Sequence, residues 1–202
     1  MSLFRKFFGT SNPASEEEKD NEYSKFTPDN DAPLEEQFIY NFKKNGGKFL
    51  YCENETEVKD HLENILEEND WFESEALCYE PELFNMLEEN KIAFDKPTNP
   101  TFLLASCENL IADEGSILFS SKQIKQRKPN ELPANIIIIA TTSQIIGTKS
   151  DGLSVIKKKY VKDYPTNITA MKYFEKAAEE DFTQYGSTAK NFVFIAFRRP
   201  II

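Results

Sequence analysis

The sequence predicts an α/β protein with three layers, α/β/α, around a mostly parallel sheet. Segments with apolar residues at helical spacing alternate along the chain with short apolar segments of strand length. One of these segments, residues 134–141 (ANIIIIAT), is a β-branched run without alternation, which is typical of a strand buried on both faces. We therefore expect a sheet with helices on both of its faces.

The N-terminal segment differs in composition from the rest of the chain. Residues 1–33 are polar, acidic and interrupted by prolines, a composition that favours disorder, so we expect a disordered acidic tail there and one folded α/β domain at residues 34–202. The first nine residues, MSLFRKFFG, place four apolar side chains around two basic ones. Two interpretations stay open for them: a short amphipathic segment that docks on a partner or a membrane surface, or a frayed terminus.

The first half of the domain is predicted to contain three helices and two strands. Residues 35–47 place Phe38, Ile39 and Phe42 on one helical face and end in two glycines, which stop a helix. The elements that follow are a strand at 48–53, a helix at 56–70 with Thr56 as its N-cap and the partly buried His61 beside its apolar stripe, a strand at 75–80, and a helix at 81–92 that starts with Pro81.

The second half is predicted to contain four strands and two long helices. Residues 101–106 (TFLLAS) are a strand, residues 107–113 (CENLIAD) one or two helical turns, and residues 116–121 (SILFSS) a strand. The remaining elements are the polar loop 122–133, the buried strand 134–141, a helix at 151–161, a helix at 167–180 that follows Thr166 or Asn167, and a strand at 191–197.

Several classes of function are disfavoured by composition. A net charge of −10 opposes nucleic-acid binding, which depends on Lys and Arg contacts to phosphates. The three cysteines lack CxxC spacing and there is one histidine, so we expect neither a disulfide framework nor a metal site. Phosphate-loop, dinucleotide, zinc-hydrolase and nucleophile-elbow motifs are all missing from the sequence. No apolar run is long enough to span a membrane and the start lacks the pattern of a secretory signal, so we expect a cytoplasmic protein.

Charge is unevenly distributed along the chain. Residues 57–95 contain 13 acidic residues and two lysines, whereas residues 117–162 contain nine Lys or Arg and two acidic residues. The cationic part either binds a small anion or an acidic face of a partner, or consists of solvated lysines without a further role.

The stretch SCENLIADEGSILFSS, residues 106–121, contains the strongest candidate site. Ligands of open α/β sheets bind at the carboxyl ends of strands, where the strand 101–106 delivers Ser106 and Glu108. In the next turn, Gly115 permits an unusual backbone shape and Ser116 offers a hydroxyl. Asp113 and Glu114 are the candidate catalytic carboxylates, and Lys125 and Arg127 are candidate anchors for an anionic small molecule. The alternative is ordinary turn and capping chemistry without a ligand.

Residues 106–146, which begin with this stretch, resemble the LUD (lactate utilization) domain family of the LutC type. The family pattern reads approximately Ala-Asp-Ala-Ala-Ile-Ala-Glu-Thr-Gly-Ser, then a strand, an Arg-containing loop, Leu-Pro and a buried strand. Asp113 stands where the family has Glu, and Glu114 where it has Thr. The positions that match directly are Ile111, Ala112, Gly115 and Ser116, followed by Arg127, Leu132 and Pro133 in the same order. Residues 45–66 resemble the Gly-Gly pair, first strand and first helix of the family, so that the resemblance covers about residues 36–202.

The resemblance implies a fold similar to the NagB/RpiA/CoA-transferase group and a role beside an iron–sulfur subunit that oxidises L-lactate. Near its C-terminus the family carries Gly-Pro-Ser-Arg-Thr-Ala-Asp-Ile-Glu and His-Gly-Pro, of which this chain keeps Thr169, Ala170 and Gly186. We therefore expect an accessory component of organic-acid oxidation without a cofactor of its own. Two other hypotheses stay open: an enzyme of CoA-transferase-like fold that acts on an anionic substrate, and a non-catalytic ligand-binding module. The sequence leaves the oligomeric state open.

Overall fold

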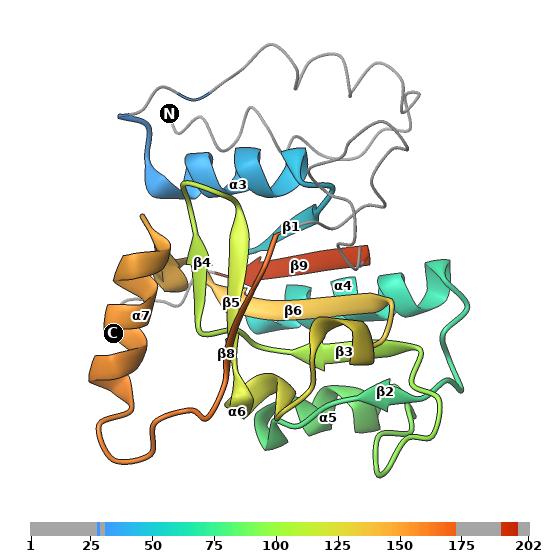
Figure 1. Cartoon of the computed structure of the whole chain (residues 1–202). Coiled ribbons are helices and arrows are strands. Elements are labelled where there is room, and N and C mark those ends of the chain that lie inside the picture. The colour runs from blue at the N-terminus through green and yellow to red at the C-terminus, as the bar shows by residue number, and fades with distance from the viewer. Residues whose placement is uncertain (1–27, 29–30, 173–190, 198–202) are drawn as a thin grey trace, which may run out of the picture. The chain divides into compact units, whose positions relative to one another are not determined.

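The computed structural model describes residues 28, 31–172 and 191–197 (Figure 1). The chain divides into two units, Met1–Asp31 and Ala32–Ile202, and all described helices and strands belong to the second. Most of the predicted tail, with its MSLFRKFFG segment, lies outside the described residues, and so does the part of the predicted helix beyond residue 172. The predicted α/β class is confirmed, because helices alternate with strands of a parallel sheet.

The central sheet has five parallel strands in the order β1-β9-β6-β3-β2. All five were predicted as strands, and their bounds are Lys48–Cys52 (β1), Ala76–Leu77 (β2), Phe102–Ala105 (β3), Asn135–Thr141 (β6) and Asn191–Phe197 (β9). Strand β6 lies between β3 and β9, and residues 136–141 are all buried. This position explains why its sequence is continuously apolar.

Two helices cover one face of the central sheet. Helix α4 (Glu55–Glu68) buries Val58, Leu62, Ile65 and Leu66, and helix α5 (Pro81–Glu89) buries Leu83 and Leu87. These side chains pack with Phe102, Leu104, Ile137 and Ile139 from the sheet. The prediction that Thr56 caps α4 is wrong: the N-cap is Asn54, whose side chain accepts a hydrogen bond from the Glu57 amide.

The other face is covered by helix α3 (Leu34–Lys44) and by a second sheet that the sequence did not predict. Helix α3 contributes Phe38 and Phe42 to the core between the layers. The second sheet has the order β7-β4-β5-β8, and its strands run across those of the central sheet (Figure 1). The bounds are Asn109–Ile111 (β4), Ser116–Ser120 (β5), Ile145–Ile146 (β7) and Ile168–Met171 (β8).

Two predicted helices are therefore wrong. Residues 109–111 form strand β4 rather than a helical turn, and residues 168–171 form strand β8 at the start of the predicted helix 167–180. Strand β5 lies between them and pairs with both in antiparallel register. Short apolar segments suit a helix or a strand equally well, and pairing with a distant segment decides between the two.

Helix α7 (Lys149–Lys159) packs on the outer face of the second sheet. A Cβ atom on its Gly152 would lie 2.6 Å from Leu118, 3.0 Å from Ile146 and 3.3 Å from Ile111, so the helix backbone lies close to the sheet. Connecting segments include α6 (Ser121–Ile124) and the 3-10 turns η1 (Pro129–Glu131) and η2 (Thr142–Gln144). None of the described helices is long and apolar enough to cross a membrane.

Candidate functional site

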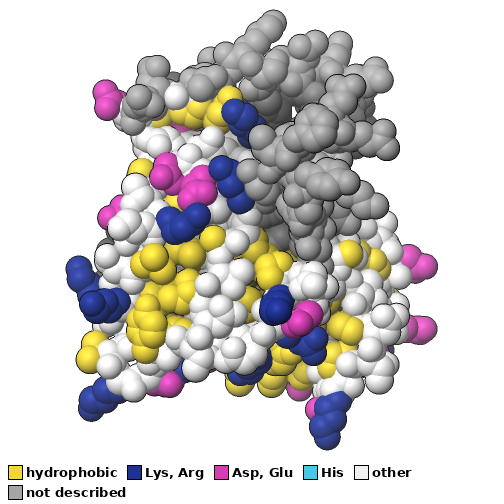
Figure 2. All heavy atoms as spheres, in the orientation of Figure 1, with side chains coloured by type: hydrophobic (Ala, Val, Ile, Leu, Met, Phe, Trp, Pro, Cys, Tyr) yellow, Lys and Arg dark blue, Asp and Glu magenta, His cyan; other side chains and the backbone are white. Residues whose placement is uncertain are grey.

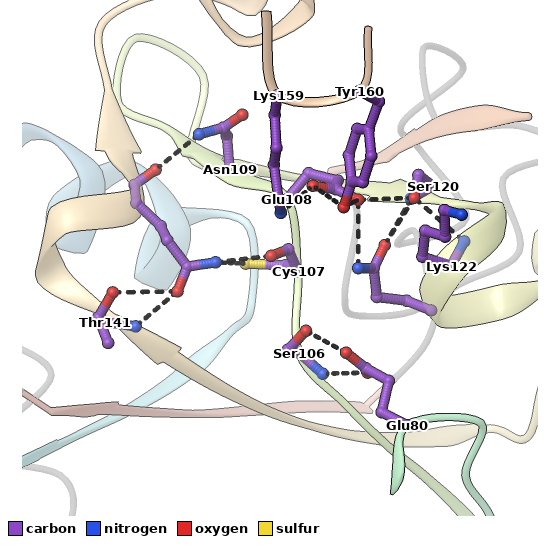
Figure 3. A network of polar contacts seen from close by, with 12 residues as sticks. Glu80, Ser106, Cys107, Glu108, Asn109, Ser120, Lys122, Thr141, Lys159 and Tyr160 are labelled. Carbon is purple, nitrogen blue, oxygen red and sulfur yellow. Dashed lines mark hydrogen bonds and ion pairs between the residues drawn. The ribbon is translucent and has the colours of Figure 1, made fainter. Parts of the chain in front are cut away.

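Polar side chains gather where strands of the central sheet end. Strand β2 leads to Glu80, and strand β3 leads to Ser106 and Glu108 (Figure 3). Strand β6 leads through the turn η2 to Gln144. The carboxyl ends of neighbouring parallel strands meet at one edge, which is where open α/β sheets bind their ligands. We call these four residues, with the side chains that bond to them, the carboxyl-edge cluster.

Glu108 is the centre of this cluster. Its side chain is 1% exposed, and it is surrounded by donors from three later segments. Oε1 accepts hydrogen bonds from Ser120 Oγ at 2.6 Å, Tyr160 OH at 2.9 Å and Gln123 Nε2 at 3.2 Å. Oε2 accepts from Lys159 Nζ at 2.9 Å and from Tyr160 OH at 3.2 Å. The carboxylate therefore joins the end of β5, helix α6 and the end of α7.

The environment of Glu108 favours its ionised form. Burial on its own would raise the pKa of this carboxyl, but the hydrogen bonds from Ser120, Lys159 and Tyr160 and the charge of Lys159 outweigh burial and hold its pKa below the ordinary value. Burial would lower the pKa of Lys159, but its contacts with Tyr160 and Glu108 raise it. The pair is therefore ionised on both sides at neutral pH. The Lys159 side chain is 53% exposed, so one side of this ion pair reaches solvent.

Glu80 has the opposite environment. The Ser106 amide donates to Glu80 Oε2 at 2.7 Å and the Ser106 hydroxyl donates to Oε1. Burial raises the pKa of Glu80 above its ordinary value, and the charges of Glu82 and Glu108 act in the same direction against the hydrogen bonds from Ser106. No cation forms an ion pair with Glu80 among the described residues. Two carboxyls of one cluster thus differ in their tendency to hold a proton.

Gln144 ties the end of β6 to the segment after β3. Its Nε2 donates to the Cys107 carbonyl at 2.6 Å, and its Oε1 accepts from the Thr141 amide at 2.8 Å. Cys107 is buried, and burial raises the pKa of its thiol well above the ordinary value. A thiol of this kind is a packing group rather than a nucleophile.

The predicted catalytic carboxylates lie at the other end of the β4–β5 hairpin. Asp113 and Glu114 belong to its turn, where Asp113 is exposed and Glu114 pairs with Lys149 at 2.9 Å and with Lys172 at 3.9 Å. Ser116 is fully buried, and its hydroxyl has no partner among the described residues. The contacts of this turn and those of Glu108 share no residue.

Gly115 has the unusual backbone conformation that was predicted from the sequence. Its φ is +62°, and a Cβ atom there would lie 2.3 Å from the backbone carbon of Asn41 in α3. Asn41 Nδ2 donates to the Ala112 carbonyl at 2.8 Å, and Asn45 Nδ2 donates to the Glu114 carbonyl at 2.7 Å. The α3 region therefore holds the turn by contacts to the backbone of the turn.

The predicted cationic anchors lie beside Tyr79, which precedes Glu80. Arg127 Nε donates to Tyr79 OH at 2.7 Å, and Lys125 Nζ lies 5.4 Å from the centre of the Tyr79 ring. Of the eight predicted site residues, Ser106 and Glu108 both lie at the carboxyl edge but bond to different partners. Lys125 and Arg127 contact Tyr79, the residue before Glu80, and the Asp113–Ser116 turn lies apart from these contacts. Their roles stay predictions.

Sequence reasoning missed the residues that complete the cluster. They include Glu80, Ser120, Gln123, Gln144, Lys159 and Tyr160. The segments containing Glu80 and Gln144 follow predicted strands, and this position was an available signal. Lys159 and Tyr160 gave none, because they lie in a run of lysines at the end of a helix.

The chemistry available to the cluster is proton exchange and anion binding. Among the described residues there is no group of three or more His, Cys, Asp or Glu placed to hold a metal ion. Both oxygens of Glu108 are already occupied by donors, whereas the Lys159 ammonium and the Arg127 guanidinium keep donors that the described residues do not use.

The fold and the carboxyl-edge cluster define an α/β protein with a polar site at its sheet edge. A family model, the LUD domain, matches residues 35–195, and the chain belongs to this family. The LUD family is associated in general with lactate utilization.

A solved structure supports the same fold. A DUF162 family protein from Deinococcus radiodurans superposes with a TM-score of 0.60 at 13% sequence identity, over 85% of this chain and 100% of that one. No curated protein matches the sequence. The similarity to the NagB/RpiA/CoA-transferase group stays a prediction.

Proposed function

We propose that this protein is an accessory, ligand-binding component of L-lactate oxidation that works beside an iron–sulfur oxidoreductase subunit in the cytoplasm. Membership of the LUD family supports the link to lactate utilization. The observation that favours an accessory role over catalysis is the state of Glu108. A general base needs a free carboxylate oxygen, but both oxygens of Glu108 accept hydrogen bonds from neighbouring side chains.

The ligand that fits this proposal is a small carboxylate such as L-lactate or pyruvate. Arg127 follows α6 near the carboxyl end of β2, and the described residues use its Nε and one Nη atom. Its planar fork suits a carboxylate, which it holds with two parallel hydrogen bonds. Lys125, over the same tyrosine ring, adds a second positive charge.

A thermal-shift screen tests the ligand. L-Lactate, pyruvate and acetate at millimolar concentration are expected to raise the Tm of the full chain, and the rise is expected to shrink as salt screens the charges. Arg127→Ala is expected to abolish the rise. Lys128→Ala is the matched control, because it removes a neighbouring exposed cation. A shift that survives Arg127→Ala, or no shift with any of the acids, contradicts the proposed ligand.

Reconstitution tests the accessory role. The iron–sulfur lactate-oxidising subunits from the same organism are expected to oxidise L-lactate faster when this protein is present than when it is omitted. A rate that does not change on addition contradicts the accessory role, whatever the thermal-shift screen shows.

A second candidate function is an enzyme of CoA-transferase-like fold, and one observation favours it. Glu80 has a raised pKa at the carboxyl end of β2 and bonds to the Ser106 hydroxyl. A partly buried carboxyl without a cationic partner is suited to giving and taking a proton. In this alternative Glu80, rather than Asp113 or Glu114, is the reacting carboxyl. Transfer of CoA from acyl-CoA to L-lactate that disappears in Glu80→Gln would favour the enzyme over the accessory role.

A further inference from the structure

Helix α7 and the segment that follows it carry exposed apolar and cationic side chains. Leu153 and Val155 lie on the two flanks of the helix, with Lys157 and Lys158 between them on its outward side. Six large hydrophobic side chains are exposed among the described residues, and four of them lie between positions 153 and 164. Their exposed fractions are 42% for Leu153, 40% for Val155, 81% for Val161 and 48% for Tyr164. Figure 2 shows apolar side chains next to lysines over the region of α7. We call these four residues, together with Lys157, Lys158 and Lys162, the α7 patch.

The lysines of the α7 patch have no acidic partner. Lys157, Lys158 and Lys162 are exposed, and none of them forms an ion pair with a described residue. Lysines in the last turn of a helix interact favourably with its dipole, which accounts for two of the three. The dipole does not account for four exposed apolar side chains in the same twelve residues. The acidic residue of the same segment, Asp163, pairs with Lys122. Exposed apolar side chains that lie together and are bordered by polar residues are typical of an interaction surface.

The opposite end of the layered unit has the complementary charge. Helices α4 and α5 cover the far face of the central sheet, whereas α7 covers the outer face of the second sheet. The outward faces of α4 and α5 are densely acidic, and Phe72, which is 40% exposed, follows α4. We call this surface the acidic layer; its exposed carboxylates without an ion-pair partner among the described residues are Asp60, Glu63, Glu67, Glu68, Glu82 and Glu88.

We propose that the α7 patch of one copy docks on the acidic layer of a second copy, so that the protein associates head to tail. Both halves of the interface are present in this chain, with complementary charge, four exposed apolar side chains on the α7 patch and Phe72 beside the acidic layer. Because the two surfaces differ and lie at opposite ends of the unit, each docked copy still offers a free patch and a free layer. Contacts of this heterologous kind build rings or filaments rather than closed dimers.

Net charge limits the strength of the contact. Each copy has a net charge of −10, so that copies repel one another over the long screening distance of dilute salt. At an ionic strength of about 0.15 M the screening distance is about 8 Å, which weakens this repulsion but leaves adjacent charges attracted. Strong salt screens the adjacent charges as well. We therefore expect association to be greatest at intermediate ionic strength.

Sedimentation velocity of the full chain tests the proposal. The weight-average sedimentation coefficient is expected to rise with protein concentration at intermediate salt and to fall back to the monomer value at high salt. The double variants Lys157→Glu/Lys158→Glu and Glu67→Lys/Glu68→Lys are each expected to stay monomeric, because each reverses two neighbouring charges of one surface and so removes the local attraction to the other. An equimolar mixture of the two variants is expected to associate, since the reversed charges attract one another in contacts between the Lys157→Glu/Lys158→Glu patch and the Glu67→Lys/Glu68→Lys layer.

The controls separate this contact from a general effect of charge. Lys44→Glu/Lys48→Glu makes the same change in net charge at exposed positions outside both surfaces, and it is expected to associate like the parent. Failure of the mixture to associate, or association that persists in Lys157→Glu/Lys158→Glu, overturns the proposal. A parent protein that stays monomeric but sediments with vesicles of phosphatidylglycerol and phosphatidylcholine also overturns it, and makes the α7 patch a lipid-binding surface instead.

Discussion

The two ends of the β4–β5 hairpin are built by different means. At one end, the turn from Ala112 to Gly115 is held through its backbone, because Asn41 of α3 and Asn45, which caps α3, donate hydrogen bonds to its carbonyls and Gly115 lies against the α3 backbone. At the other end, the Ser120 hydroxyl donates a hydrogen bond to Glu108, and Gln123 of α6 and Lys159 of α7 donate to the same carboxylate.

The two ends therefore depend on different parts of the sequence. A backbone-held turn depends on the glycine and on a neighbouring helix, and it tolerates changes at Asp113 and Glu114. A side-chain cluster depends on the identity of every member, since each member supplies a hydrogen-bond donor or acceptor that another member needs. The turn end is therefore held by contacts to its backbone, and the Glu108 end is held by contacts between side chains.

The largest effect is expected at the turn end. Gly115→Ala places a Cβ atom inside the backbone of α3 at a positive φ, so helix or turn has to shift. We expect a loss of about 3 kcal/mol or more in the free energy of unfolding. Urea denaturation of the variant and the parent measures this loss. A midpoint equal to that of the parent would mean that α3 does not constrain the turn.

The next largest effect is expected at the Glu108 end. Glu108→Gln keeps the shape of the side chain but removes the charge that pairs with Lys159 and directs an amide NH2 at existing donors. We expect a loss of about 2 kcal/mol in the free energy of unfolding. Glu114→Gln is the matched control at the turn end, where a partly exposed pair predicts a loss of less than about 1 kcal/mol. Equal losses in the two variants would remove the contrast between the ends.

The contributions of Glu108 and Glu80 to stability are expected to depend on pH in opposite directions. The folded pKa of Glu108 lies below its unfolded value, so its stabilisation is complete above about pH 4.3 and is lost as the pH falls through that value toward the folded pKa. The folded pKa of Glu80 is raised, so its contribution is lost as the pH rises from about 4.3 toward the folded pKa.

Unfolding curves of Glu108→Gln and Glu80→Gln at several pH values measure both contributions. The stability advantage of the parent over Glu108→Gln is expected to grow with rising pH, and its advantage over Glu80→Gln is expected to shrink. Parallel pH dependence in the two variants would show that the environments of the two carboxyls do not differ.

The smallest effect is expected next to the glycine. Ser116→Ala removes a buried hydroxyl that has no partner among the described residues, and the smaller side chain leaves little space. We expect the free energy of unfolding to stay within about 0.5 kcal/mol of the parent or to rise slightly. Differential scanning calorimetry checks this value. A large loss would reveal a hydrogen bond to the Ser116 hydroxyl.

The sequence predicted the elements that rest on local patterns. The helical stripe of α4, the proline start of α5 and the apolar run of β6 each lie within one segment, and the structure confirms all three. The φ of Gly115 was predictable for the same reason, because turn chemistry is local.

The second sheet and most of the carboxyl-edge cluster depend on distant pairing. Strand β4 has three residues and becomes a strand because it pairs with β5 and β7 on its two sides. Glu108 reaches Tyr160 across 52 positions of the sequence, and neither residue type nor spacing points to that contact. In the sequence Lys159 does not differ from the lysines beside it, Lys157 and Lys158. In the structure its position at the end of α7 makes it the ion-pair partner of the buried Glu108.

The order of the central sheet has a consequence for how the protein is made. Strand β9 follows every other described strand in the sequence, yet it lies between β1 and β6 and pairs with both. Until residue 197 has left the ribosome, β1 has no neighbour in this sheet, and an edge of β6 stays open. Such distant pairing is slow and exposes strand edges that aggregate. A nascent chain that stalls before β9 is therefore expected to need a chaperone, and the central sheet is expected to be completed only once β9 has emerged.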